Sequence, residues 1–217
     1  MALHSLFPTR VYSAVLQRGN WRALNNRLLQ ECLQLRRDDA AGRSWSIDNY
    51  PGGYTSYASV SRMQQFSPTF ALLERRLARH VRLLAATLQF DLTDRQLSMT
   101  DCWVNIMGPQ AVHGLHLHPL ATLSGTYYVQ TPRGSPGLKF EDPRLDRYMA
   151  APPRQRLAAI DNRPWVVLPA EAGRVLLFES WLRHEVAANP SPARGSAAAR
   201  SRLPAERVSI SFNYGWF

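Results

Sequence analysis

The pattern of the chain changes near residue 96, and this change constrains the fold more than any other feature. From there on, short apolar or β-branched runs alternate with segments rich in Gly, Pro and Asn; the runs read LSMTDCWVNIM, TLSGTYYVQ, GLKF, WVVL, GRVLLF and RVSISFNYGWF. Runs of this length and spacing are typical of a sandwich or barrel of short strands. We therefore predict a β-rich core over residues 97–217, with loops on its rim at 131–137, 142–164 and 188–206.

Residues 1–96 are predicted to support this core, mainly with two helices. Asn20 can cap a helix from Trp21 to about Arg37, in which apolar side chains recur every three or four positions. A second helix is expected to begin at Ser67-Pro68, because Ser is a preferred cap and Pro is tolerated in the first helical turn. Both helices are expected to pack against the sheet.

Two further N-terminal segments carry weaker signals. Residues 6–16 alternate weakly and are expected to form an edge strand. Residues 38–60 contain DDAAGRS and NYPGGYTSY, whose Gly, Pro, Asn and Asp favour turns. The length of 217 residues suits one domain. The sequence therefore predicts a single α+β domain, 1–217.

Composition excludes several classes of protein. Hydrophobic residues make up 45% of the chain, which is too many for a globally disordered protein. No apolar run approaches the roughly 18 residues that a membrane span needs, and no secretory signal is recognisable, so we expect a cytoplasmic protein with no membrane partner. The formal net charge is +10, but the basic residues are scattered, which disfavours nucleic acid as the partner. The sequence is compatible with a monomer or a homodimer.

Histidines carry the clearest chemical signal. His113, His116 and His118 fall within six residues, and His184 follows an apolar run. On an extended strand, His116 and His118 project from the same face, at a separation that one divalent metal ion can bridge. His184 can supply a third ligand from a neighbouring strand, which leaves coordination positions open, as in catalytic metal sites. His113 has an odd offset from His116 and is predicted to face across the strand.

The context of these histidines resembles the iron(II)- and 2-oxoglutarate-dependent oxygenase superfamily, and more narrowly a bacterial and phage branch of it. The resemblance covers about residues 98–215. Its motifs are H-x-H-P at His116, S-G-x-Y-Y-V at Ser124, the series Pro169, Gly173, Phe178 and His184, and R-x-S-x-S-F-N at Arg207.

The resemblance implies a fold, an activity and a set of ligands. The fold would be a double-stranded β-helix, a cupin-like jelly roll. The activity would be hydroxylation of an organic, small-molecule or peptide-like substrate with O2, Fe(II) and 2-oxoglutarate. His116, His118 and His184 would hold the iron, with His118 standing where the superfamily has the carboxylate of its 2-His-1-carboxylate triad. That replacement makes the site one unit more positive.

The remaining site residues follow from the same resemblance. Arg207 and Ser209 would bind the distal carboxylate of 2-oxoglutarate, because Arg offers a planar fork and Ser a hydroxyl donor. Of Tyr127 and Tyr128, one is expected to face the interior and bind the cosubstrate, and the other to face outward. Further residues on the expected strands are predicted to line the pocket: Asn105, Ser124, Asn213 and His113.

Two other functions stay open on the sequence. A cupin-like metal-binding protein or enzyme that does not use 2-oxoglutarate would explain the H-x-H pattern but not the position of Arg207. A basic binding protein without catalysis would explain the net charge, and would bind nucleic acid in a salt-dependent manner.

Overall fold

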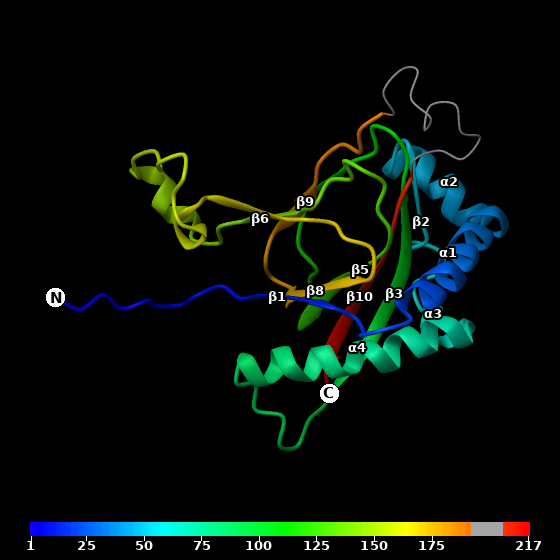
Figure 1. Cartoon of the computed structure of the whole chain (residues 1–217), viewed down its shortest axis with the longest axis horizontal. Coiled ribbons are helices and arrows are strands. Elements are labelled where there is room, and N and C mark those ends of the chain that lie inside the picture. The colour runs from blue at the N-terminus through cyan, green and yellow to red at the C-terminus, as the bar shows by residue number, and fades with distance from the viewer. Residues whose placement is uncertain (192–205) are drawn as a thin grey trace.

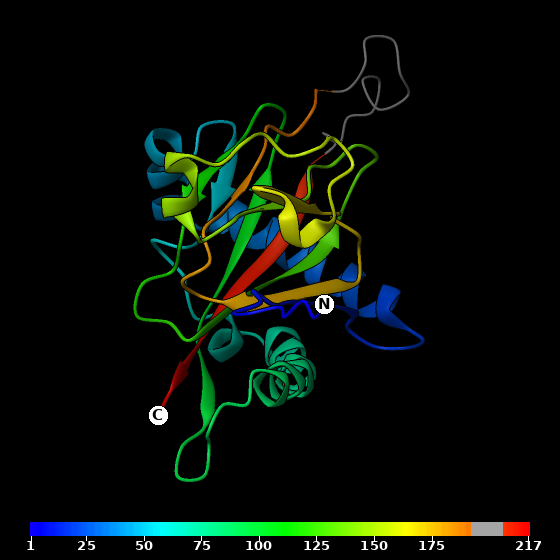
Figure 2. The same ribbon diagram turned by 90° about the vertical axis from the view of Figure 1, so that its left-hand side faces the viewer.

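The computed structural model describes residues 1–191 and 206–217, so most of the loop predicted at 188–206 lies outside the described residues. Within them, two antiparallel sheets face each other, and helices cover the outer side of the larger sheet (Figures 1 and 2). This is the α+β jelly roll that the sequence predicts.

The larger sheet contains most of the long strands. Its order is β1 (Val11–Val15), β8 (Arg174–Glu179), β5 (Leu123–Gln130), β10 (Arg207–Trp216), β3 (Leu97–Met107) and β2 (Gly53–Thr55). The smaller sheet has the order β4 (His113–His116), β9 (His184–Val186), β6 (Leu138–Glu141) and β7 (Trp165–Leu168). The six apolar runs of the sequence correspond to β3, β5, β6, β7, β8 and β10.

Both predicted helices are present. The helix α1 (Trp21–Asp38) begins at Asn20, whose side chain accepts a hydrogen bond from the backbone N–H of Ala23. The helix α4 (Pro68–Thr87) begins at Ser67, whose hydroxyl oxygen accepts hydrogen bonds from two backbone N–H groups of the first turn. Short helices lie at Met63–Phe66 (α3), Leu145–Met149 and Ile160–Asn162.

The prediction of turns throughout residues 38–60 is wrong in part, because a helix, α2, spans Ala40–Asn49. Asp39 begins it by accepting a hydrogen bond from the backbone N–H of Gly42 (2.8 Å). The same carboxylate accepts hydrogen bonds from the hydroxyl groups of Tyr54 (2.8 Å) and Ser59 (2.5 Å). These contacts with β2 and the following loop stabilise a helix that its own composition does not favour.

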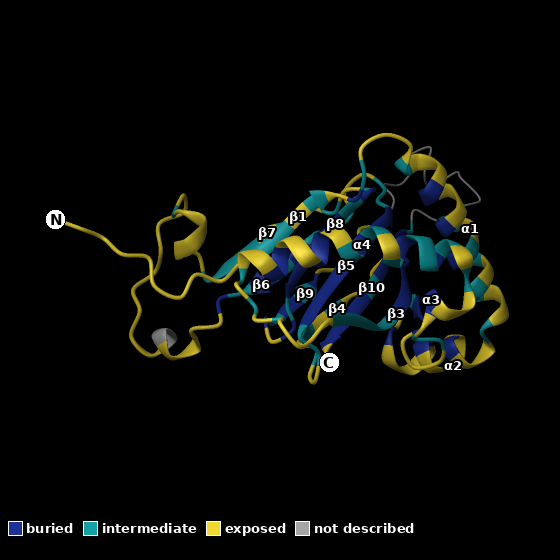
Figure 3. Ribbon diagram, turned by 90° about the horizontal axis from the view of Figure 1, so that it is seen from below, coloured by how far each residue is buried: buried dark blue, intermediate teal, exposed yellow. Residues whose placement is uncertain are grey.

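Alternation along the strands separates two interiors. One face of the large sheet packs against α1 and α4 in an apolar core that includes Val104, Ile106, Val208, Ile210 and Phe212. The opposite face turns toward the small sheet and carries the polar residues of β10, which lie between these apolar ones in sequence. Figure 3 shows the central strands buried between these layers, with mostly exposed residues at the N-terminus and in the segment after β6.

The N-terminal region is an integral part of the sheet, since it supplies the edge strands β1 and β2. The edge strand predicted within 6–16 is confirmed as β1, which pairs with β8. None of the helices in the described residues is both long enough and apolar enough to cross a membrane.

Candidate metal centre

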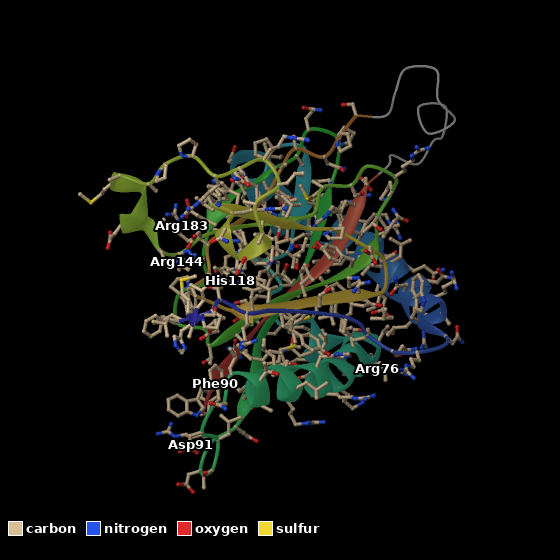
Figure 4. The ribbon with its side chains drawn as sticks, turned by 60° about the vertical axis from the view of Figure 1, so that its left-hand side comes forward. Arg76, Phe90, Asp91, His118, Arg144 and Arg183 are labelled. Atoms are coloured by element: carbon tan, nitrogen blue, oxygen red, sulfur yellow. The ribbon has the colours of Figure 1, made fainter. Side chains whose placement is uncertain are left out.

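His116, His118 and His184 meet between the two sheets. Each offers one ligand nitrogen, and these atoms all lie within 4.8 Å of one another. The ring centres are 4.4 Å apart for His116 and His184, and 5.1 Å apart for His118 and His184. Pairing of β4 with β9 places His116 directly opposite His184. His118 lies just beyond β4, where its backbone N–H donates to the carbonyl oxygen of Ser180 (3.0 Å). In Figure 4, His118 lies among the strands, well away from Arg76 on α4.

All three imidazoles have an acceptor beside Nδ1. The partners are the carbonyl oxygen of Gly114 for His116 (2.7 Å), the carbonyl oxygen of Leu182 for His184 (2.9 Å) and Oδ1 of Asn213 for His118 (2.6 Å). An acceptor at Nδ1 favours the tautomer that carries its proton there, which leaves Nε2 as a metal ligand. Three neutral imidazoles suit Fe, Zn, Cu or Ni, and leave other coordination positions open.

Burial favours the neutral imidazoles that metal binding requires. It lowers the pKa of His184 to about 3, and the nearby His116 acts in the same direction. Burial also lowers the pKa of His118 from its ordinary value, although its hydrogen bond to Asn213 acts in the opposite direction. These rings therefore need not lose a proton before they bind a cation at neutral pH.

His113 does not face across the strand as its spacing predicts. A β-bulge between His113 and His116 shifts the pairing, so that His113 lies opposite Val186 while His116 lies opposite His184. The extra residue returns His113 to the cavity side. There its ring stacks on Tyr50, with centres 4.3 Å apart, and lies 5.9 Å from the ring of His116.

Arg207 lies deeper in the same cavity and is only 2% exposed. One terminal nitrogen, Nη1, contacts the hydroxyl of Ser209 and the sulfur of Met107, both at 3.2 Å. The guanidinium carbon lies 5.0 Å from the ring centre of Tyr128, and Nε has no hydrogen-bond partner in the described part of the chain. Within that part no carboxylate pairs with Arg207. A buried cation without an anion is costly, so this guanidinium fits an anionic ligand.

Other polar atoms near Arg207 also lack partners within the described residues. They are the hydroxyl groups of Tyr50 and Tyr128 and Oδ1 of Asn105. Burial raises the pKa of both tyrosines, so their hydroxyl groups stay protonated and can donate. Buried polar groups without partners are rare, and several around one cavity fit a polar ligand. Tyr50 was not predicted as a site residue, because it lies in the segment NYPGGYTSY, whose composition indicated only turns.

The two adjacent tyrosines face opposite sides of β5. Tyr128 lies beside Arg207, whereas the hydroxyl of Tyr127 donates to Oδ1 of Asn25 on α1. Tyr127 therefore belongs to the apolar core under the helices. The prediction that Tyr127 contacts the cosubstrate is wrong. Strict alternation along β5 is the physical reason.

The remaining predicted residues line or adjoin the cavity. Ser209 and Asn105 lie opposite each other on β10 and β3, and Nδ2 of Asn105 donates to the hydroxyl of Ser211 (3.0 Å). Ser124 and Asn213 both contact Nδ1 of His118. Trp103, which was not predicted as a site residue, closes the cavity beside His118, with ring centres 5.7 Å apart.

A larger cavity, of about 750 Å³, lies elsewhere, between residues 3–11 and the segments 140–144 and 160–163. It contains His4 but none of the clustered histidines. Its size alone does not make it the reactive site, because the groups suited to bind a metal and an anion line the smaller cavity.

The sequence matches one family model, described as “Putative 2OG-Fe(II) oxygenase”, over residues 101–213. The matched range covers more than half of the chain and includes every site residue named above except Tyr50. No curated protein sequence matches the chain.

Solved structures share the fold at low sequence identity. A prolyl-4-hydroxylase from Pseudomonas putida has a TM-score of 0.58 and 13% identity, over 95% of this chain and 92% of that one. HygX from Streptomyces hygroscopicus, with nickel, 2-oxoglutarate and hygromycin B bound, has a TM-score of 0.55 and 16% identity, over 95% and 83%. A prolyl hydroxylase from Trichoplax adhaerens, in complex with a peptide fragment of hypoxia inducible factor, has a TM-score of 0.57 and 16% identity, over 94% and 83%.

Proposed function

Because this chain belongs to the family of 2OG-Fe(II) oxygenases, we propose that it is a non-haem Fe(II) dioxygenase that uses 2-oxoglutarate and O2 to hydroxylate an organic substrate, with release of succinate and CO2. One observation carries the proposal to this chain's own residues. One cavity contains three convergent histidines and a buried guanidinium that has no carboxylate partner in the described part of the chain.

The three histidines are the proposed iron ligands. His116, His118 and His184 would bind through Nε2, and their Nδ1 partners would keep each ring in the required tautomer and orientation. Bound iron, with 2-oxoglutarate and O2, would supply the oxidising chemistry, which side chains alone cannot provide. Protein groups then have to hold the reactants in place and keep water away from them.

Arg207 is the proposed anchor for the distal carboxylate of 2-oxoglutarate. Its guanidinium would donate two hydrogen bonds to that carboxylate, and the hydroxyl groups of Ser209 and Tyr128 would donate further ones. Asn105 and Tyr50 adjoin the same space with unpartnered polar atoms. The cosubstrate dianion would also compensate the charge of the metal, which three neutral imidazoles leave unbalanced.

The substrate is proposed to be a small molecule or a peptide-like molecule. Structural relatives were solved with hygromycin B in one case and a peptide fragment in another. In this chain Trp103 lies at the metal end of the cavity, and its ring contacts that of the half-exposed Tyr57 at 5.2 Å between centres. These aromatic rings would offer a hydrophobic wall to the substrate.

Anaerobic titration tests the proposal. Adding Fe(II) and 2-oxoglutarate to the protein should produce a weak visible charge-transfer band, and admission of O2 should then release succinate. His184→Ala should abolish the band, and Arg207→Ala should greatly raise the concentration of 2-oxoglutarate needed to produce it. His4→Ala, at an exposed position in the larger cavity and outside the one that contains the clustered histidines, is the control and should behave as wild type.

The same titration decides against the second candidate. A cupin-like protein that does not use 2-oxoglutarate would retain a bound metal but show no band and no dependence on Arg207. That result would reject the oxygenase proposal.

A further inference from the structure

His118 differs from the other two histidines in what holds its ring. Nδ1 of His116 and of His184 each contacts a backbone carbonyl oxygen two residues away. Nδ1 of His118 instead contacts two side chains from other strands, Oδ1 of Asn213 on β10 at 2.6 Å and the hydroxyl oxygen of Ser124 on β5 at 3.0 Å. The histidine that stands where a carboxylate would be expected is therefore the one whose orientation depends on a tertiary contact.

The amide group of Asn213 is fixed from both sides. Its nitrogen Nδ2 lies 3.4 Å from Oδ2 of Asp101, the residue opposite it on β3. Its oxygen Oδ1 accepts a hydrogen bond from the hydroxyl of Ser124 (2.8 Å). Asp101 in turn accepts a hydrogen bond from the hydroxyl of Thr100 (2.8 Å).

These contacts determine which way the amide points. An ionised carboxylate only accepts hydrogen bonds, so the NH2 group of Asn213 must face Asp101 and the oxygen must face His118. Because the hydroxyl of Ser124 donates to Oδ1 of Asn213, both oxygens beside Nδ1 can accept a hydrogen bond from His118. His118 therefore carries its proton on Nδ1, which leaves the lone pair on Nε2. The charge of Asp101 thus determines the tautomer of His118 through one intervening amide.

We propose that Asn213, oriented by Asp101, is a positioning residue that holds His118 in the Nδ1–H tautomer and directs Nε2 toward the metal. The inference rests on the proposed function, in which the three histidines bind the metal. Metal-bound histidines commonly donate their other N–H to a carboxylate. Here an amide lies between the two groups, and the negative charge sits one residue farther from the metal.

Metal binding to the full chain tests the inference without turnover. Affinity for Co(II) is measured by calorimetry in the absence of 2-oxoglutarate, and the geometry of the site by the visible spectrum of bound Co(II). Asn213→Ala should weaken binding by about 10–100-fold and alter the spectrum. Asn25→Ala is the matched control, because Asn25 is also buried and hydrogen-bonded but lies on α1 beside Tyr127. It should lower stability and leave Co(II) affinity unchanged.

An exchange of the two side chains separates positioning from packing. Asp101→Asn alone should weaken Co(II) binding, because the amide of Asn213 can then turn over. The double variant Asp101→Asn with Asn213→Asp keeps the composition and places the carboxylate directly against His118. It should bind Co(II) at least as tightly as wild type. This pair of variants decides the question even where Asn213→Ala does not fold.

Four results separate this inference from the proposed function or overturn both. Wild-type affinity in Asn213→Ala, or a double variant as weak as Asp101→Asn, would overturn the positioning role and leave the oxygenase proposal standing. If Asn213→Ala binds Co(II) more weakly than the wild type, and the wild type shows no response to 2-oxoglutarate, the positioning role is supported and the oxygenase proposal is rejected. Failure of the wild type to bind Co(II) at all would overturn both.

Discussion

Arg207 is expected to lower the stability of the ligand-free protein, because it is a buried charge kept for ligand binding. Its guanidinium is buried between the sheets with no carboxylate partner in the described residues. Replacing even a buried ion pair by apolar side chains of similar volume is often neutral or stabilising, by about 1–4 kcal/mol, because the charges no longer have to be desolvated. We therefore expect Arg207→Met to raise the free energy of unfolding of the ligand-free protein while it abolishes binding of 2-oxoglutarate.

Urea denaturation without ligand and the charge-transfer titration measure the two effects of Arg207→Met separately. Arg36→Met is the control, because Arg36 pairs with Glu206 at 2.7 Å in a partly exposed position on α1. It should change stability by less than about 1 kcal/mol and leave ligand binding intact. A clear loss of stability in Arg207→Met would contradict the idea that its charge is uncompensated.

The adjacent tyrosines of β5 provide a matched pair of variants. Tyr127→Phe removes the hydrogen bond to Asn25 and leaves the buried amide oxygen Oδ1 of Asn25 without a donor, so it should cost about 1–3 kcal/mol of stability. Tyr128→Phe removes a hydroxyl group that has no partner in the described residues, so it should hardly change stability but should weaken binding of 2-oxoglutarate. Thermal denaturation and ligand titration of both variants should give these opposite outcomes; the reverse assignment would contradict the orientation of the two rings.

Sequence reasoning at this scale succeeded where spacing alone decides geometry. The i, i+2 spacing of His116 and His118 predicted that both rings project to one side, and His184 was expected on a neighbouring strand; the structure brings the three together, with His116 paired opposite His184. It failed for His113, because a β-bulge cannot be read from spacing. It left Tyr127 and Tyr128 undecided, since alternation gives opposite faces but does not tell which face is which.

At the scale of elements, one histidine joins the edge strand β1 to the helix α4. Nδ1 of His80 lies 2.8 Å from the hydroxyl of Tyr12, and Nε2 lies 2.8 Å from the carbonyl oxygen of Leu16. We expect His80→Leu to lower stability by about 1–3 kcal/mol, because the buried carbonyl of Leu16 and the partly buried hydroxyl of Tyr12 lose their partner. Hydrogen exchange should accelerate first at the amides of β1.

The exchange pattern distinguishes a local effect from a global one. His4→Leu, near the exposed N-terminus, is the control and should leave exchange and stability unchanged. If His80→Leu accelerates hydrogen exchange equally in all strands, β1 does not open independently. That result would contradict a local role of His80 in holding β1 against α4.

Elements with strong periodicity were predictable, and those held by tertiary contacts were not. The alternation and the separating Gly and Pro residues gave the strands of the core, and the caps at Asn20 and Ser67 gave the long helices. The helix α2 lacks apolar residues at a helical spacing. It depends on Asp39, which caps the helix and also accepts hydrogen bonds from Tyr54 and Ser59. Contacts between residues far apart in the sequence leave no periodic signal.

At the scale of the whole molecule, metal binding should be linked to folding. The three histidines come from two strands and a following loop of the small sheet, so the site exists only in the folded chain. A metal present at 100 times its dissociation constant should raise the free energy of unfolding by about 2.7 kcal/mol. Thermal denaturation with Ni(II) should show this increase, and a chelator should reverse it.

A variant and a pH series test whether the stabilisation by Ni(II) arises at the three histidines. His116→Ala should unfold at the same temperature with and without Ni(II). The stabilisation by Ni(II) should also shrink as pH falls, because protons compete with the metal for the same imidazole nitrogens. Stabilisation that persists in His116→Ala would place the metal elsewhere on the chain.

We also propose that residues 1–96 and the core at 97–217 form one domain that folds as a unit. The layers of the molecule follow from the resemblance and from strand periodicity, and the edge strand within residues 6–16 was expected. The pairing of β1 with β8 and the contribution of β2 to the core sheet were not. Pairing between strands that are distant in the sequence is set by the complete fold, which short-range patterns do not contain.

The register of β10 has an evolutionary consequence. Arg207, Ser209, Ser211 and Asn213 occupy alternate positions of one strand, and the apolar residues between them fill the core beneath the helices. Insertion or deletion of a single residue within this strand would exchange the two sets, burying the guanidinium in hydrocarbon and filling the reaction chamber with aliphatic groups. Descendants of this chain can therefore vary β10 by replacing residues but not by changing their number.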